Sequence, residues 1–232
     1  MSNIKIITGN IFTSNCQTIV NTVNCVGIMG AGIALECRLR YPEMYKQYTQ
    51  LCDQREIDIG KLWIYKSTDR WILNFPTKKH WKYPTKEQYL HEGLQKFIST
   101  YELKKIHSIA FPLLGAQNGG IESSRSLQIM ESYLSKCNIP VEIYLYDKNA
   151  YDDVYEKFKS YFLASSNDEL KQATNISINI INLIKQSLND QNIHQLNQLA
   201  SVKGIGDKTL EKCFSFMLSQ NPNQHPIQHQ LI

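Results

Sequence analysis

A glycine-rich stretch, residues 21–34, constrains the fold of this chain more than any other segment. The apolar run 18–20 before it predicts a short buried strand, and the pattern after it predicts a helix over about 30–39. Such a strand–turn–helix unit leaves backbone N–H groups unpaired, and these suit a pyrophosphate. The spacing is not the GxGxxG fingerprint, and a plain connection without a ligand remains an equal alternative.

Strands alternate with helices along the first 160 residues, which predicts an α/β domain with a mixed sheet covered by helices. The strands are expected at 4–8, 18–20, 62–65, 71–75, 108–111 and 141–146, and the main helices at 30–39, 42–54, 85–97, 122–136 and 150–162. In such folds ligands bind at the carboxyl ends of strands. Both glycine loops, 27–32 and 112–120, and the loop after Phe75 fall at such ends.

The positive charge of the chain is concentrated in its first part. Residues 1–164 carry 20 of the 25 Lys and Arg but 16 of the 21 acidic residues, whereas the rest has five of each. This part is therefore suited to a polyanionic substrate.

The six cysteines form no CxxC pair and have no histidines at zinc spacing. We expect reduced thiols in a cytoplasmic protein, with no metal and no cofactor. Cys25, inside the glycine stretch, is read as a small packing residue in preference to a nucleophile. No signal peptide or apolar run of about 18 residues is found, so we expect no membrane insertion.

Two sets of polar residues near the glycine loops are candidates for ligand contacts. The amides of Asn21 and Asn24 can bond ribose hydroxyls, although asparagine also caps turns. The segment 78–86 interleaves lysines and aromatic rings and contains no acidic residue. Such a segment suits a nucleic-acid strand, because the lysines can contact phosphates and the rings can stack on bases. Its alternative is a solvated basic loop.

Four loops, in this order, resemble those of the macrodomain family. They are Gly9-Asn10-Ile11, the run 19–34, Phe75-Pro76-Thr77-Lys78 with His80-Trp81, and the second glycine loop 112–120. The third and fourth narrow the resemblance to the branch of DarG-type DNA ADP-ribosyl glycohydrolases and the terminal ADP-ribose protein glycohydrolase. The resemblance covers about residues 3–147 and implies a three-layer α/β/α sandwich with a mixed sheet.

The resemblance implies a site for ADP-ribose built from these loops. Gly9, Asn10 and Ile11 correspond to the adenine end, where most macrodomains have aspartate in place of Asn10. Asn24 corresponds to the distal ribose. The remaining expected ligand contacts are Asn21, Met29, Gly30, Gly32, Ile33, Ala34, Thr77, Pro112, Leu114, Gly115, Asn118, Gly119 and Gly120.

Lys78 matches the catalytic lysine of this branch, and Lys79 does not. The protein-directed relative also has an aspartate in the second glycine loop, where this chain has Gly119. That difference argues for the DNA-directed enzymes. We therefore expect Lys79, His80, Trp81 and Lys82 to contact nucleic acid.

The last part of the chain is expected to be a separate all-α domain. We predict a macrodomain over 1–163, a small helical domain over 168–219 and a disordered tail over 220–232. Residues 202–208 resemble a helix-hairpin-helix, in which Gly204, Gly206 and Lys208 would contact DNA phosphates. A plain helical hairpin that packs on the domain or on a protein is the alternative.

The sequence thus predicts a metal-independent, lysine-dependent ADP-ribosyl glycohydrolase. Its substrate would be ADP-ribosylated nucleic acid, with DNA favoured, and a DarT-like toxin would be its partner. The alternatives are a non-catalytic ADP-ribose-binding module and a hydrolase of protein-linked ADP-ribose or O-acetyl-ADP-ribose.

Overall fold

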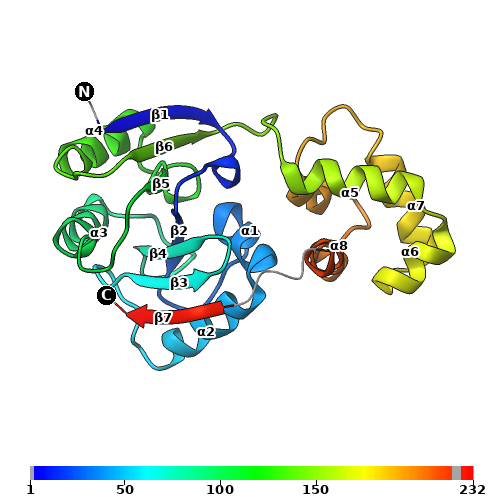
Figure 1. Cartoon of the computed structure of the whole chain (residues 1–232), viewed down its shortest axis with the longest axis horizontal. Coiled ribbons are helices and arrows are strands. Elements are labelled where there is room, and N and C mark those ends of the chain that lie inside the picture. The colour runs from blue at the N-terminus through cyan, green and yellow to red at the C-terminus, as the bar shows by residue number, and fades with distance from the viewer. Residues whose placement is uncertain (1–2, 221–225, 232) are drawn as a thin grey trace. The chain divides into compact units, whose positions relative to one another are not determined.

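A computed structural model describes residues 3–220 and the backbone of 226–231 (Figure 1). The chain divides into two compact units. Unit 1 comprises Met1–Tyr146 with Asn223–Ile232, and unit 2 comprises Asp147–Pro222. The helix after Tyr146 therefore belongs to unit 2, whereas the sequence placed it in the first domain.

Unit 1 is built on one sheet, in which seven strands occur within the described residues, in the order β1-β6-β5-β2-β4-β3-β7. Neighbouring strands from β1 to β4 are parallel, and β3 and β7 are added antiparallel at one edge, so the predicted mixed sheet is confirmed. The strands are β1 (Ile4–Gly9), β2 (Thr18–Asn24), β3 (Trp63–Ser67), β4 (Trp71–Lys78), β5 (Ile109–Pro112), β6 (Val141–Tyr146) and β7 (Pro226–Leu231).

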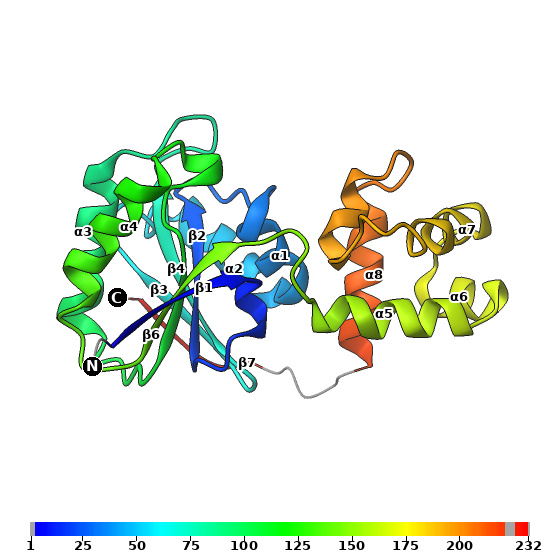
Figure 2. The same cartoon turned by 90° about the horizontal axis from the view of Figure 1, so that it is seen from above.

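Helices cover both faces of the sheet, which confirms the three-layer sandwich (Figure 2). α1 (Gly32–Arg40) and α2 (Pro42–Asp53) lie on one face, and α3 (Glu87–Thr100) and α4 (Ser123–Leu134) on the other. Consecutive strand residues supply the two cores: Ile19 packs in the cluster of α1 and α2, and Val20 in that of α3 and α4. This alternation is the period of two expected for a strand covered on both sides.

Two segments of unit 1 differ from the prediction. Residues 76–78 continue β4, although the sequence placed them in an irregular loop. Residues 226–231 form β7 and pair with β3, although the sequence predicted disorder there. The remainder of that predicted tail, apart from Gln220, lies outside the described residues.

Unit 2 is a helical unit, as the sequence predicted, but its elements are shorter. It contains α5 (Asp153–Ala164), α6 (Asn167–Thr174), α7 (Ile178–Ser187), the 3-10 helix η3 (Leu196–Ser201) and α8 (Asp207–Ser219). The single helix expected over 168–188 is interrupted at Asn175, whose φ of 53° ends α6. Two α5 residues, Phe158 and Phe162, stack at 4.1 Å in the core of this unit.

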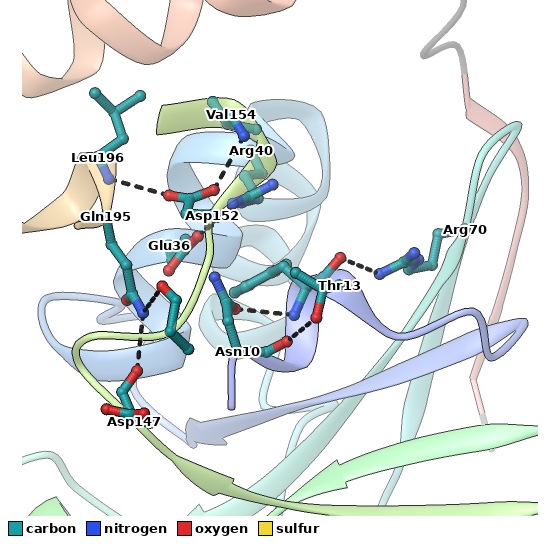
Figure 3. Close-up of polar contacts among 12 residues, drawn as sticks. Asn10, Thr13, Glu36, Arg40, Arg70, Asp147, Asp152, Val154, Gln195 and Leu196 are labelled. Atoms are coloured by element: carbon teal, nitrogen blue, oxygen red, sulfur yellow. Dashed lines mark hydrogen bonds and ion pairs between the residues drawn. The ribbon is translucent and has the colours of Figure 1, made fainter. Parts of the chain in front are cut away.

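Asp152 ties the start of α5 to η3 within unit 2 (Figure 3). Its carboxylate accepts hydrogen bonds from the backbone N–H groups of Val154 at 3.1 Å and Leu196 at 3.0 Å. The side chain is fully buried, so these bonds satisfy a polar group that would otherwise be costly to bury.

Candidate functional site

Five parallel strands bring their carboxyl ends to one edge of the sheet in unit 1. β1 ends at Gly9, β2 at Asn24, β4 at Lys78 and β5 at Pro112. The prediction that the glycine loops follow the carboxyl ends of strands is therefore confirmed. All four macrodomain-like loops meet at this edge.

The first glycine loop, residues 25–31, is held in shape by the side chain of Asn24. The Asn24 Nδ2 donates to the carbonyl of Ile28 at 2.5 Å, and its Oδ1 accepts from Val26 N at 3.0 Å and from Ile28 N at 3.4 Å. The hydroxyl of Tyr48 donates to the Asn24 carbonyl at 2.5 Å. Both amide atoms of Asn24 therefore brace the loop, and its expected contact with a ribose stays a prediction.

The loop leads into α1, which begins without a side-chain cap. Ala31 stands at the N-cap position in an extended conformation. Because an α-helix leaves its first N–H groups without an intrahelical partner, the amides of Gly32, Ile33 and Ala34 are donors suited to an anion. A Cβ on Gly32 would lie 3.1 Å from Asn118 Nδ2, so this helix start lies against the second glycine loop.

The second glycine loop, residues 113–120, is shaped by close packing. Gly115 has φ +67°, and a Cβ there would lie 2.9 Å from Ile121 Cδ1. A Cβ on Gly119 would lie 2.7 Å from Thr85 Oγ1, while Thr85 N donates to the Gly119 carbonyl at 2.9 Å. An aspartate at 119, as in the protein-directed relative, would therefore collide with Thr85.

Lys78 emerges from β4 next to an irregularity in strand pairing. Val23 pairs with Pro76 but Asn24 pairs with Lys78, so Thr77 is an extra residue in β4. Such a bulge changes the direction in which the following side chain points. The half-buried Lys78 reaches the second glycine loop, where its Nζ donates to the carbonyl of Asn118. The same Nζ donates to the carbonyl of Trp81, in its own segment, at 3.5 Å.

Lys79 points to a different group. Its Nζ forms an ion pair with Asp58 Oδ1 at 2.7 Å, and this bond raises the pKa of Lys79. Cys25 lies beside the same carboxylate, with its Sγ 3.3 Å from the carbonyl of Lys78. Burial and Asp58 raise the pKa of the Cys25 thiol to about 12. The thiol is therefore protonated at neutral pH, which fits the interpretation of Cys25 as a packing residue.

Three residues expected at the ligand, Asn21, Met29 and Leu114, lie in the core instead. Met29 is fully buried and packs in the cluster of α1 and α2. Asn21 is fully buried, and its Nδ2 donates to Asn74 Oδ1 at 2.9 Å across β2 and β4. Leu114 is also fully buried; its N–H points to Met130 Sδ and its carbonyl accepts from Ser126 Oγ at 2.6 Å. In this structure these three residues are part of the core beneath the loops and do not line the surface of the site.

The segment after Lys79 presents aromatic rings to solvent. His80 stacks on Trp81 with ring centroids 5.5 Å apart, and Tyr83 contacts the same histidine ring. Trp81 is 50% exposed and Tyr83 65% exposed, while the ammonium of Lys82 lies 5.5 Å from the Trp81 ring. Exposed rings flanked by lysines form a surface on which bases can stack.

The other edge residues are positioned by contacts that the sequence did not predict. Asn10 caps the short 3-10 helix η1 (Ile11–Thr13) after β1. Arg70 holds η1 by donating to the carbonyl of Phe12 at 3.0 Å (Figure 3). Arg70 also donates to the carbonyl of Ser14, the C-cap of η1, at 2.6 Å. Tyr48, Asp58, Thr85 and Arg70 were all missed, because their contacts join segments far apart in the chain.

The predicted hairpin in unit 2 has one helical arm of the expected kind. Gly204 has φ +102°, Gly206 is the N-cap of α8 without a side-chain cap, and Lys208 is exposed. The preceding arm is the 3-10 helix η3 rather than an α-helix. Of the predicted helix-hairpin-helix, the structure therefore has the glycine loop and the second helix, α8, and the proposed DNA contact of these residues depends on those two elements.

Neither a metal-binding cluster nor a membrane-spanning helix occurs among the described residues. Across the part of the chain that the structure describes, no group of three His, Cys, Asp or Glu side chains is arranged to hold a metal ion. No helix in that same part has the length and apolar character needed to span a bilayer.

Comparison with known proteins agrees with this fold. The Macro domain model matches residues 20–130. The solved macrodomain of Mycobacterium tuberculosis DarG is 38% identical, with a TM-score of 0.59, and the match covers 61% of this chain and 96% of that one. The chain therefore belongs to the macrodomain family.

Within that family the similarity is to proteins of the DarG type. A Thermus aquaticus protein named DNA ADP-ribosyl glycohydrolase is 34% identical over 148 residues, which are 62% of this chain and 41% of that relative. The structure of Thermosipho africanus DarTG in complex with ADP-ribose is 32% identical, with a TM-score of 0.61 over 66% of this chain and 44% of that one. The chain thus spans about two fifths of the Thermus aquaticus relative.

Proposed function

We propose that this protein is a glycohydrolase that releases ADP-ribose from a nucleic-acid base, with DNA as the substrate, and that it is the antitoxin of a DarT-like toxin. The position of Lys78 carries the proposal. A bulge at the end of β4 directs its amine to the second glycine loop, which lies against the start of α1, at the edge where parallel strands end. The similarity to a named DNA ADP-ribosyl glycohydrolase supports the substrate.

In this proposal the diphosphate binds at the start of α1, against the second glycine loop. The backbone donors of the first turn face the phosphates, and the exposed Asn118 and Gly120 approach from the opposite loop. The adenine of ADP-ribose lies toward β1. The remaining proposed contacts are Gly9, Asn10, Ile11, Asn24, Gly30, Thr77, Pro112, Gly115 and Gly119.

Lys78 acts on the distal ribose of the bound ADP-ribose in one of two ways. Its neutral amine attacks C1″ as the bond to the base breaks and the base leaves with the electron pair; ring opening then gives a Schiff base that water hydrolyses. Alternatively, its ammonium stabilises the departing base. Both routes need the amine at C1″, and neither uses a carboxylate at position 119.

The loop beyond Lys79 would hold the nucleic acid next to the scissile bond. His80 and Trp81 offer stacked rings, and Lys79 and Lys82 offer charge to the backbone phosphates. The exposed Tyr83 extends this surface. We place the reaction in the cytoplasm, in keeping with six free cysteines.

Unit 2 would add affinity for unmodified DNA through Gly204, Gly206 and Lys208. Replacing Lys208 with Ala should weaken binding to unmodified DNA. The slope of log affinity against log salt concentration should become shallower by about one, the value for one lost phosphate contact. Titrations at two salt concentrations measure this, with Lys171→Ala, an exposed lysine away from the hairpin, as control. An unchanged salt slope would instead assign the hairpin to packing or to a protein partner.

The central test replaces Lys78 with Ala in the full chain. Release of ADP-ribose from ADP-ribosylated DNA should fall at least about a thousandfold, while ADP-ribose affinity stays within a few-fold, because binding is spread over many backbone donors. Turnover is measured in excess chelator, which should leave the wild-type rate unchanged. ADP-ribosylated protein is offered in parallel and should not be processed.

Lys79→Ala is the matched control, paired with Lys79→Ala/Asp58→Asn because Lys79 neutralises Asp58. Both variants should keep most turnover at high salt. Near wild-type turnover by the Lys78 variant would refute the lysine assignment. Binding without turnover by the wild-type protein would assign it to the non-catalytic readers of ADP-ribose.

A further inference from the structure

Lysine side chains gather at the edge of the unit 1 sheet opposite to the candidate site, where β3 ends and β4 and β5 begin. Lys66, near the end of β3, places its ammonium 3.9 Å from the centroid of the Trp71 ring, at the start of β4. Lys104 and Lys105 follow α3 and precede β5. No acidic residue occurs in β3 or among residues 103–107. These three lysines are called the lysine cluster below.

Hydrogen bonds from Gln17 join the two segments that carry the lysine cluster. The Gln17 carbonyl accepts from the backbone N–H of Trp71 at 2.9 Å. Its Oε1 accepts from His107 N at 2.8 Å, and its Nε2 donates to the Lys105 carbonyl at 3.3 Å. Lys105 has a φ of 58°, which is uncommon for a residue other than glycine. The turn after α3 is therefore held next to the start of β4.

The lysine cluster brings like charges within reach of one another. Burial lowers the pKa of Lys66, and the charges of the other two lysines lower it further. The acidic residues adjacent to these segments already accept hydrogen bonds from hydroxyl groups. Glu102 accepts from Tyr101 at 3.0 Å, and Asp69 accepts from Ser67. A group of cations held together in this way is suited to a polyanion.

α3 connects the lysine cluster with the exposed rings of the candidate site. The helix follows the loop of His80, Trp81 and Tyr83 at one edge of the sheet and ends shortly before Lys104 at the other. Its 14 residues span roughly 21 Å at about 1.5 Å per residue. A stacked nucleic-acid strand rises about 3.4 Å per nucleotide, so about six nucleotides cover that length. Lys86, exposed at the N-cap of α3, offers a further cation beside this path.

We propose that the lysine cluster binds backbone phosphates of the nucleic-acid strand, about six nucleotides from the bases that stack on His80 and Trp81. Contacts to phosphates hold the strand in register without reading its sequence. A strand longer than about six nucleotides is then the preferred substrate, because it reaches both ends of α3. This inference rests on the proposed function, since it assumes that the exposed rings hold the strand.

The test compares Lys66→Gln/Lys105→Gln with the control pair Lys5→Gln/Lys46→Gln in the full chain. The control removes the same charge from exposed lysines of β1 and α2. Affinity is measured at several salt concentrations for unmodified single strands of about four and about twelve nucleotides. Melting temperatures establish that each variant is folded.

The Lys66→Gln/Lys105→Gln variant should bind the longer strand at least about tenfold more weakly at about 0.1 M salt, with a salt slope shallower by about 0.7 for each lost contact. Its affinity for the short strand should fall by less than about twofold, because that strand cannot reach both ends of α3. Lys66→Arg/Lys105→Arg keeps both charges and should bind the longer strand as the wild-type protein does.

An equal loss in the control pair, or an equal loss for both strand lengths, would overturn the inference. So would normal binding of the longer strand together with weaker binding of polyglutamate, which would assign the lysine cluster to an acidic protein. Release of ADP-ribose from a short ADP-ribosylated strand should be unchanged in the Lys66→Gln/Lys105→Gln variant. If the wild-type protein lacks that turnover, the proposed function fails, whereas the length-dependent loss of binding would still support this inference.

Discussion

The first glycine loop is held in shape by polar side chains, whereas the second is held by the lack of space around its glycines. The side chains of Asn24 and Tyr48 make four hydrogen bonds in the first loop. A Cβ placed on Gly30 in this loop would have Ile28 Cγ2 as its nearest neighbour, at 3.8 Å. In the second loop, a Cβ on Gly115 or Gly119 would be within 3.0 Å of a neighbour. The shape of the first loop therefore depends on side-chain hydrogen bonds, and that of the second on the space around its glycines.

The largest effect is expected in the second loop. Gly119→Asp forces a side chain onto Thr85, and overpacking of this kind costs about 1–3 kcal/mol of folding free energy. It also displaces the carbonyl of Asn118, which holds Lys78, so ADP-ribose binding and turnover should both fall sharply. Denaturant titration and calorimetry measure these losses.

Thr85→Ala tests whether the collision is the cause. The Thr85 hydroxyl has no hydrogen-bond partner, so its removal alone should cost little. Combined with Gly119→Asp it removes the nearest atom and leaves Cβ at 3.3 Å, so binding should largely return. No recovery in the double variant would mean that the second loop is not shaped by packing.

A smaller loss is expected from the bracing side chains of the first loop. Asn24→Ala removes bonds to Ile28 and Val26 and should lower the free energy of unfolding by about 1–3 kcal/mol, with weaker ADP-ribose binding. Tyr48→Phe keeps the ring and loses one bond, so it should cost about 1 kcal/mol. Equal effects of the two variants would contradict a loop braced chiefly by Asn24.

The smallest change in stability is expected for Gly30→Ala. Its Cβ would make only an ordinary contact, with Ile28 Cγ2 at 3.8 Å, and its φ is not left-handed, so the free energy of unfolding should change by less than about 0.5 kcal/mol. ADP-ribose binding should nevertheless weaken, because the methyl group takes space that the diphosphate would occupy. Gly27→Ala, at φ +77°, is the contrasting variant, with a strain of about 1–3 kcal/mol.

The local features of the site were predictable from the sequence, and its long-range contacts were not. Glycines that follow apolar runs identified both loops, because strand ends and turns depend mainly on residues adjacent in the sequence. Asn21 was expected at the ligand, but it pairs with Asn74, and nothing in the sequence shows that β2 and β4 are neighbours. The lack of space for a side chain at Gly119 is due to Thr85, and the sequence does not show that these two residues are in contact.

The element boundaries failed where context overrode local preference. Pro76 suggested a loop, yet β4 runs through it to Lys78. The polar residues 226–231 suggested disorder, yet they extend the sheet by pairing with β3. Asn175 suggested nothing, although it adopts the left-handed conformation that ends α6. In each case the deciding interaction lies outside the window that a sequence pattern covers.

The extra residue at Thr77 has a consequence for how relatives are compared. Two consecutive lysines follow it, and the pairing of β4 with β2, rather than the letters of the sequence, determines which amine faces Asn118 and which faces Asp58. During evolution, loss of the bulge with Thr77 retained would pair Thr77 with Asn24 and move each lysine one place along the strand register. Alignments of this segment should therefore be anchored on strand register, since matching identical letters could assign the reactive amine to the wrong lysine.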